Sequence, residues 1–162
     1  MIRLKRILVP TDFSETSQVA VKYGIALARA FKAQLYLLHV PERGEVSGVE
    51  HPIGLADTMD QNPAGEQLST VLTEEEMAEL RPERIVRNGK PYNEIVRYSQ
   101  ENDIDLIVMG THGREGVARV LIGSVAETVV RRSPCPVLTV HHPEHEFVLP
   151  DEPVGHSADA RT

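Results

Sequence analysis

Residues 106–113 read Leu-Ile-Val-Met-Gly-Thr-His-Gly, a short apolar run followed at once by glycines. Three further runs have the same apolar character: Ile7–Val9, Leu35–Val40 and Val137–Val140. All of these runs are continuous rather than alternating, which is typical of parallel strands covered on both faces. A weaker fifth run, Arg84–Arg87, carries charged residues at its ends and indicates a strand nearer the edge of the same sheet.

Helical patterns separate these predicted strands. Ser14 is a candidate N-cap for a first helix, whose apolar stripe would comprise Ala20, Gly24, Leu27 and Phe31. Three more helices are predicted: one somewhere within Ala64–Leu80, one that begins at Pro91 and ends at Asn102-Asp103, and one that begins at Ser124 and is closed by Ser133-Pro134. Strict alternation of strands and helices favours an α/β protein with right-handed crossovers. We therefore predict a single-domain, doubly wound, Rossmann-like fold with a five-stranded parallel sheet in the order 3-2-1-4-5.

Two stretches do not fit the alternation. Residues 41–65 hold Pro41, Pro52 and Pro63 among several glycines without any sustained period, which indicates either a flexible insertion or a lid that helps to form a site. Residues 141–162 hold five acidic residues against one arginine and are expected to form a disordered acidic tail. The predicted α/β domain therefore spans residues 1–140.

Composition narrows the class of protein. The chain has 162 residues, which is enough for one domain. Its 17 Lys and Arg and 24 Asp and Glu give a net charge of −7, and this negative charge argues against a nucleic-acid partner. Cys135 is the single cysteine, so no internal disulfide can form and a reducing compartment is expected. No apolar run approaches the roughly 18 residues of a membrane span. We expect a cytoplasmic protein with no membrane partner.

The glycines that follow Leu106–Met109 belong to a longer pattern. Gly110 and Gly113 are followed, after nine residues, by Gly123-Ser124 at the start of a predicted helix. Glycines after a parallel strand allow a phosphate or sugar to approach the backbone, and a helix N-terminus attracts anions. The alternative is structural: the glycines shape a turn and Ser124 is an N-cap. Spacing alone does not separate the two interpretations.

A carboxylate at the end of the first predicted strand favours the binding interpretation. Asp12 follows Ile7–Val9, and in a 3-2-1-4-5 sheet the first and fourth strands are neighbours at the point where the connections reverse direction. Asp12 and Gly110 should therefore meet at one crevice, although Asp12 could also serve as a cap beside Ser14. Neither a G-x-x-x-x-G-K-[ST] loop nor a G-x-G-x-x-G fingerprint is present.

Three segments resemble the ATP-binding branch of the universal stress protein family: Val9-Pro10-Thr11-Asp12, Gly110-x2-Gly113-x9-Gly123-Ser124, and Pro134–Leu138. The resemblance covers about Leu4 to Val140 and implies an adenine nucleotide α-hydrolase-like fold. It also implies a nucleotide site. In that site, Pro10, Thr11 and Asp12 would flank the adenine and ribose, and the Val40 backbone would meet the adenine edge. The ribose and phosphates would contact Met109, Gly110 and Gly113, and the phosphates would be bound by Gly123, Ser124 and Val125. The implied ligand is ATP, or ADP or AMP.

Charged and polar side chains near the glycine pattern are further candidates for the same site. Arg114 is expected to clamp phosphates, whereas Arg119 fits a solvated loop, and His112 fits either a phosphate contact or the surface. Bound ATP should bring Mg²⁺ or Mn²⁺, held mainly by phosphate oxygens and water, and we assign no protein ligand to it. A metal site at His141, His142 and His145 is disfavoured because the tail lacks fixed geometry.

No residue in the sequence stands out as a general base, because Glu115 and Glu127 fit the surface of a loop and a helix. The predicted function is therefore that of an ATP-binding regulatory or stress-response protein, with at most slow ATP hydrolysis or autophosphorylation. The alternatives are a slow ATPase or phosphotransferase that uses the same pocket, and a dimeric scaffold without nucleotide. Val137–Val140 is an uncharged edge strand, and pairing across a two-fold axis, common in the family that the chain resembles, predicts a homodimer.

Overall fold

The computed structural model describes residues 1–41, 63–111 and 123–140. Its elements are, in chain order, β1 Arg6–Pro10, α1 Glu15–Phe31, β2 Gln34–His39, α2 Pro63–Ser69, α3 Glu74–Leu80, β3 Glu83–Val86, α4 Pro91–Glu101, β4 Leu106–Gly110, α5 Ser124–Arg132 and β5 Val137–Val140. The five strands form one parallel sheet in the order β3-β2-β1-β4-β5. The predicted fold class and strand order are confirmed, and every strand lies within one residue of its predicted bounds.

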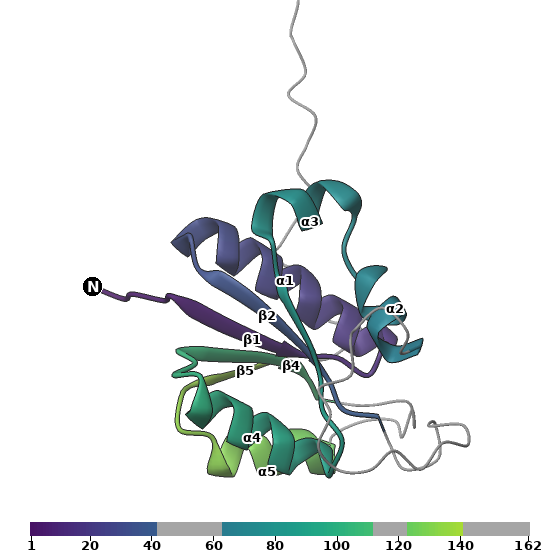
Figure 1. The fold of residues 1–162 in the computed structure, drawn as a ribbon. Coiled ribbons are helices and arrows are strands. Elements are labelled where there is room, and N and C mark those ends of the chain that lie inside the picture. The colour runs from purple at the N-terminus through teal and green to yellow at the C-terminus, as the bar shows by residue number, and fades with distance from the viewer. Residues whose placement is uncertain (42–62, 112–122, 141–162) are drawn as a thin grey trace, which may run out of the picture.

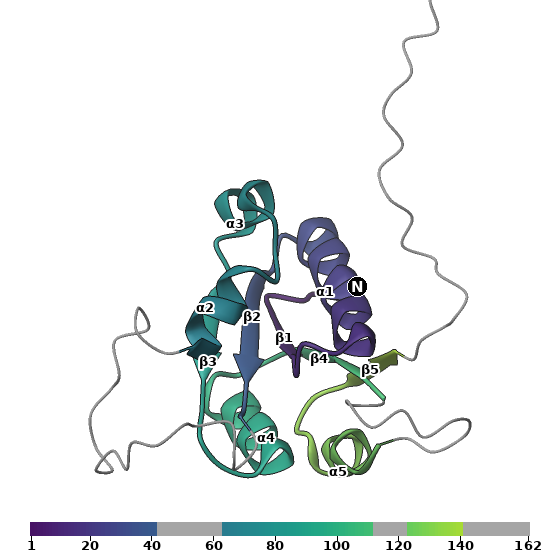
Figure 2. The same cartoon turned by 90° about the vertical axis from the view of Figure 1, so that its right-hand side faces the viewer.

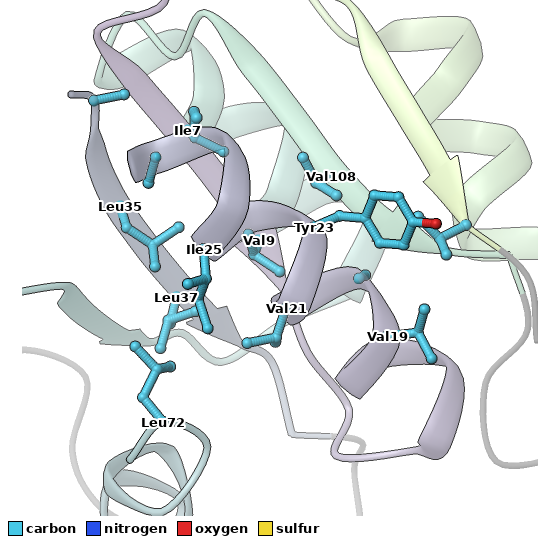
Figure 3. Packing of buried hydrophobic residues seen from close by; sticks show 14 of the residues in the cluster. Ile7, Val9, Val19, Val21, Tyr23, Ile25, Leu35, Leu37, Leu72 and Val108 are labelled. Atoms are coloured by element: carbon cyan, nitrogen blue, oxygen red, sulfur yellow. The ribbon is translucent and has the colours of Figure 1, made fainter. Parts of the chain in front are cut away.

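Helices cover both faces of the sheet (Figure 1), with α1, α2 and α3 on one face and α4 and α5 on the other. Neighbouring strand residues alternate between two apolar clusters. Ile7, Val9 and Val108 pack toward α1 (Figure 3), whereas Leu8 and Ile107 pack toward α4 and α5. Because both faces are buried, the strands need apolar residues at every position, which explains their continuous runs.

Helix α1 confirms the predicted start and corrects the predicted stripe. Ser14 is the N-cap, and its hydroxyl accepts a hydrogen bond from the Ser17 N–H. The buried face continues from Ala20 and Gly24 to Ala28, whereas Phe31, at the last position of the helix, is 38% exposed. The inclusion of Phe31 in the core stripe was therefore wrong, because the buried face follows a spacing of four residues that leaves the last residue outside it.

The segment between β2 and β3 contains two short helices instead of the single helix predicted within Ala64–Leu80. Thr73 and Glu76 form a capping box: the Thr73 hydroxyl accepts from the Glu76 N–H at 3.2 Å, and the Glu76 carboxylate accepts from the Thr73 N–H at 2.9 Å. The acidic residues 74–76 form the first turn of α3, where carboxylates interact favourably with the helix dipole.

Helix α2 shortens the predicted insertion. Its first turn takes in Pro63, Ala64 and Gly65, and the last two of these are buried. The remainder of the insertion and the predicted tail lie outside the described residues. Among the residues that the structure describes, no helix has both the length and the apolar character needed to cross a membrane.

Candidate functional site

The candidate site lies at the carboxyl ends of β1 and β4. These strands are paired, with Ile7 opposite Leu106 and Leu8 opposite Ile107, while β2 and β3 extend the sheet on one side and β5 on the other. The direction of the chain connections therefore reverses between β1 and β4, which makes their carboxyl ends the ligand-binding edge of such a sheet. Figure 2 views the sheet from this edge.

Asp12 follows β1 and has one carboxylate oxygen engaged. Its Oδ1 accepts hydrogen bonds from the Ser14 N–H at 3.0 Å and from the Ser14 hydroxyl at 2.5 Å. The alternative role of Asp12, as a cap beside Ser14, is therefore present in the structure. No described residue donates a hydrogen bond to Oδ2, and the side chain is half-buried rather than enclosed. Asp12 can thus support the start of α1 and still offer an acceptor to a ligand hydroxyl.

Thr11 is more deeply embedded than Asp12. The residue is 6% exposed, its N–H donates to the Leu38 carbonyl at 2.9 Å, and its hydroxyl is 3.1 Å from the Ser17 hydroxyl. The same Thr11 oxygen accepts from the Phe13 N–H at 3.1 Å. The Thr11 side chain is therefore used inside the protein. Pro10, the last residue of β1, is also buried.

Three of the predicted site residues belong to one apolar cluster. Val40, one residue beyond β2, and Met109 in β4 are both buried on the face of the sheet covered by α4 and α5, and Val125 of α5 packs against the same cluster. Residues next to the end of the second strand, in the fourth strand and in the last helix thus belong to one buried apolar cluster near the ends of β1 and β4.

Gly110 has a packing role that the sequence analysis did not foresee. A Cβ atom at this position would lie 2.8 Å from Thr16 Cγ2 and 3.1 Å from the Thr16 carbonyl carbon. The absence of a side chain thus lets α1 approach the end of β4. This close contact explains the glycine without a ligand, and it is distinct from the turn that we considered as the structural alternative.

The N-terminus of α5 corrects one interpretation of Ser124. Gly123 occupies the N-cap position and Ser124 is the first helical residue, with no side-chain hydrogen bond capping this end. The Glu127 N–H bonds to the Gly123 carbonyl, so the preceding N–H groups of Ser124, Val125 and Ala126 have no acceptor within the helix. Ser124 is exposed. Three backbone donors and a helix dipole at an open helix end make a suitable anion site.

A backbone hydrogen bond joins the two halves of the glycine pattern. The Gly123 N–H donates to the Thr111 carbonyl, which brings the start of α5 to the end of β4. His112, Gly113 and Arg114, as well as Arg119, lie outside the described residues. Among the residues that are described, no group of three or more His, Cys, Asp or Glu side chains is placed to hold a metal ion.

Two residues at this edge were missed by the sequence analysis. His39 is 4% exposed, and its Nδ1 lies 2.8 Å from the Thr11 carbonyl oxygen. The His39 ring packs against the Phe13 ring with their centroids 4.5 Å apart, and Phe13 has a positive φ of 65°. The available signal was the histidine itself, which interrupts the apolar run Leu35–Val40.

Comparison with known proteins gives a consistent result. The model of the universal stress protein family matches residues 3–141. Universal stress protein MJ0531 of Methanocaldococcus jannaschii is 37% identical over 146 residues, which cover 88% of this chain and 85% of that protein.

Two solved structures show the same fold. The structure of protein MJ0577, 32% identical, superimposes with a TM-score of 0.61 over 89% of this chain and all of that one. A universal stress protein solved in complex with cAMP, 26% identical, gives a TM-score of 0.62 over 86% of this chain and 98% of that one.

Proposed function

This chain belongs to the universal stress protein family, and on that premise we propose that it is a regulatory protein that binds an adenine nucleotide at the carboxyl ends of β1 and β4. One observation carries the proposal: the Asp12 carboxylate, whose Oδ2 accepts no hydrogen bond from a described residue, lies at the same edge of the sheet as the start of α5, where three N–H groups have no acceptor within the helix. The similar protein solved with cAMP supports an adenine nucleotide in particular.

The proposed ligand is ATP, or ADP or AMP, with its parts distributed along this edge. The base would lie beside Val40 and Met109, the ribose near Asp12, and the phosphates at Gly123–Val125. Arg114, Gly113 and His112 would complete the phosphate site. Mg²⁺ or Mn²⁺ would accompany ATP and be held by phosphate oxygens and water, which is the usual arrangement for these ions in nucleotide sites.

Binding, rather than turnover, is the activity that we propose. Phosphoryl transfer to water requires a group that orients or deprotonates the attacking molecule. Glu127, the acidic residue in the first turn of α5, is exposed and paired with Arg131 at 2.9 Å on the surface of the helix. At most slow hydrolysis or autophosphorylation would follow, and a cytoplasmic location fits the single cysteine.

We further propose that β5 forms a homodimer. It is an edge strand next to β4, and Val137, Leu138 and Thr139 are only half-buried. The carbonyls of Pro136 and Val140 accept from β4, so the alternate backbone groups, including the Thr139 N–H, point to the open edge. An uncharged strand at the edge of the described sheet, with alternate backbone groups that point outward, favours pairing with a second copy of the chain.

The nucleotide proposal is tested by denaturing freshly purified protein and identifying any released nucleotide by mass spectrometry. Calorimetric titration with ATP, ADP, AMP and cAMP, and with GTP as a control, then measures affinity. We expect an adenine nucleotide to bind and the Asp12→Ala variant to bind it more weakly. No released nucleotide together with no heat on titration would favour the scaffold alternative. Phosphate release that disappears in Gly123→Val but persists in Asp12→Ala would instead favour an enzyme.

A further inference from the structure

His39 is a buried polar residue at the end of an apolar strand. A buried imidazole is unfavourable unless its nitrogens are hydrogen-bonded, and the Nδ1 of His39 meets the Thr11 carbonyl oxygen at 2.8 Å. A carbonyl oxygen only accepts hydrogen bonds, so Nδ1 carries the proton and donates it. In the neutral ring Nε2 is then unprotonated, which fixes the tautomer of His39.

This hydrogen bond replaces a step of the parallel β-ladder. Pro10 is opposite Leu38, and the Thr11 N–H donates to the Leu38 carbonyl. In a regular parallel pair the next bonds would join the Thr11 carbonyl to the Val40 N–H and the Phe13 N–H to the Val40 carbonyl. Instead, the Thr11 carbonyl is bound by His39 and the Phe13 N–H is bound by the Thr11 hydroxyl.

The consequence is that the Val40 backbone has lost both of its ladder partners. No hydrogen bond joins Val40 to another residue in the described part of the chain. The Phe13 conformation maintains this arrangement: its φ of 65° turns the chain away from the direction of β1, and its ring rests on the His39 ring. A bulky residue keeps a positive φ only where surrounding contacts hold it there.

We propose that His39 is a positioning residue for the base of the nucleotide, and this inference rests on the proposed function. By binding the Thr11 carbonyl, His39 leaves the Val40 N–H and C=O as a neighbouring donor and acceptor that have no partner among the described residues. That pair is complementary to the N1 acceptor and N6 amino donor of adenine. Guanine presents the opposite pattern, an N1–H donor and an O6 acceptor, and leaves both backbone groups mismatched.

Three substitutions separate positioning from packing. His39→Asn retains an amide N–H close to the Nδ1 position, His39→Gln moves the amide toward the Nε2 position, and His39→Leu removes the donor. We expect ATP affinity, measured by calorimetry, to fall about tenfold in His39→Leu and His39→Gln, the size of one lost hydrogen bond, and to be largely retained in His39→Asn. The preference for ATP over GTP should fall in parallel. Urea unfolding of the three variants shows how much stability each one loses.

The two proposals fail in different ways. If wild-type protein binds no adenine nucleotide, the proposed function is overturned. If wild type binds ATP and His39→Leu binds it within about twofold of wild type, the role of His39 alone is overturned. Nitrogen-15 NMR of the histidine ring in the wild-type protein gives a test that needs no variant to fold. We expect the Nδ1-protonated tautomer, and an Nε2-protonated ring would overturn the assignment.

Discussion

The backbone of Thr16 in the first turn of α1 lies close to Gly110 at the end of β4. A Cβ atom on this glycine would be 3.1 Å from the Thr16 carbonyl carbon and 3.2 Å from the carbonyl oxygen. Backbone atoms cannot rotate away as the end of a flexible side chain can. The contact therefore couples the helix that carries the Asp12 loop to the strand that carries Met109 and Gly110.

Replacing Gly110 with alanine should destabilise the protein even without a ligand. The added methyl group would force α1 and β4 apart, and overpacking of this kind costs about 1–3 kcal/mol. Urea unfolding of the ligand-free variant measures the loss. Gly24→Ala is a comparison variant in the same layer. Its Cβ would meet side-chain atoms only, with Val9 Cγ2 at 2.5 Å, whereas the Cβ at Gly110 would also meet the Thr16 backbone. A ligand-free Gly110→Ala protein as stable as wild type would show that packing does not require this glycine.

The contrast between the strands and Gly110 shows what the sequence can predict. Continuous apolar runs identified β1, β2, β4 and β5 because both faces of the middle of a parallel sheet are buried, whereas the edge strand β3 is only half-buried and gave the weaker run with charged ends. The contact between Gly110 and Thr16 depends on how a distant helix crosses a strand, which no local pattern contains. The role of His39 could not be predicted from a local pattern either, because the pairing of β1 with β2 brings its hydrogen-bond partner Thr11 beside it.

One local signal was present in the sequence but was not used. Thr73-Glu74-Glu75-Glu76 has the Thr-x-x-Glu spacing of a capping box, which the structure contains at the start of α3. At the candidate site, the positions of Asp12 and of the α5 start followed from strand order. The identity of the N-cap residue did not, because choosing between Gly123 and Ser124 requires a boundary accurate to one residue.

Ser14→Ala should lower both stability and nucleotide affinity. The Ser14 hydroxyl caps α1 and donates to Asp12 Oδ1, so its loss costs about 1 kcal/mol and leaves the Asp12 carboxylate held by the Ser14 N–H alone. Thr73→Ala removes the equivalent cap of α3, away from the strand ends that form the site. We expect the control to lose stability, measured by urea unfolding, without a change in ATP affinity. Equal affinity losses in both variants would contradict a specific link between Ser14 and the site.

The thiol of Cys135 should react slowly in the folded protein. Burial raises its pKa, and this effect outweighs the hydrogen bond from Ser133, which lowers the pKa. A raised pKa means a smaller thiolate fraction at pH 8, and the thiolate is the reactive form. Alkylation by iodoacetamide at pH 8 should therefore be slower for folded than for urea-unfolded protein. Equal rates would indicate an accessible thiol of ordinary pKa.

Thr139→Pro should separate the proposed dimer into monomers. The Thr139 N–H points to the open edge of β5, so proline removes a donor for a partner strand while the bonds to β4 remain. Leu138→Pro is the control, because the Leu138 N–H faces β4 and its loss should destabilise the fold. Light scattering with size-exclusion chromatography measures the mass. A monomeric wild type, or a folded Thr139→Pro protein that remains dimeric, would contradict pairing through β5.

Ser124→Asp distinguishes an anion site from a structural helix start because it should move stability and affinity in opposite directions. A carboxylate at the first position of α5 interacts favourably with the helix dipole, so stability should be maintained or rise by about 0.3–1 kcal/mol. The same charge would repel nucleotide phosphates and compete for the N–H groups of Val125 and Ala126. We expect ATP affinity to fall by at least about tenfold, whereas Ser124→Ala should lose only the contribution of the hydroxyl. Thermal unfolding and calorimetric titration of the same samples measure both quantities. Unchanged ATP affinity in Ser124→Asp would remove the α5 N-terminus from the proposed phosphate site.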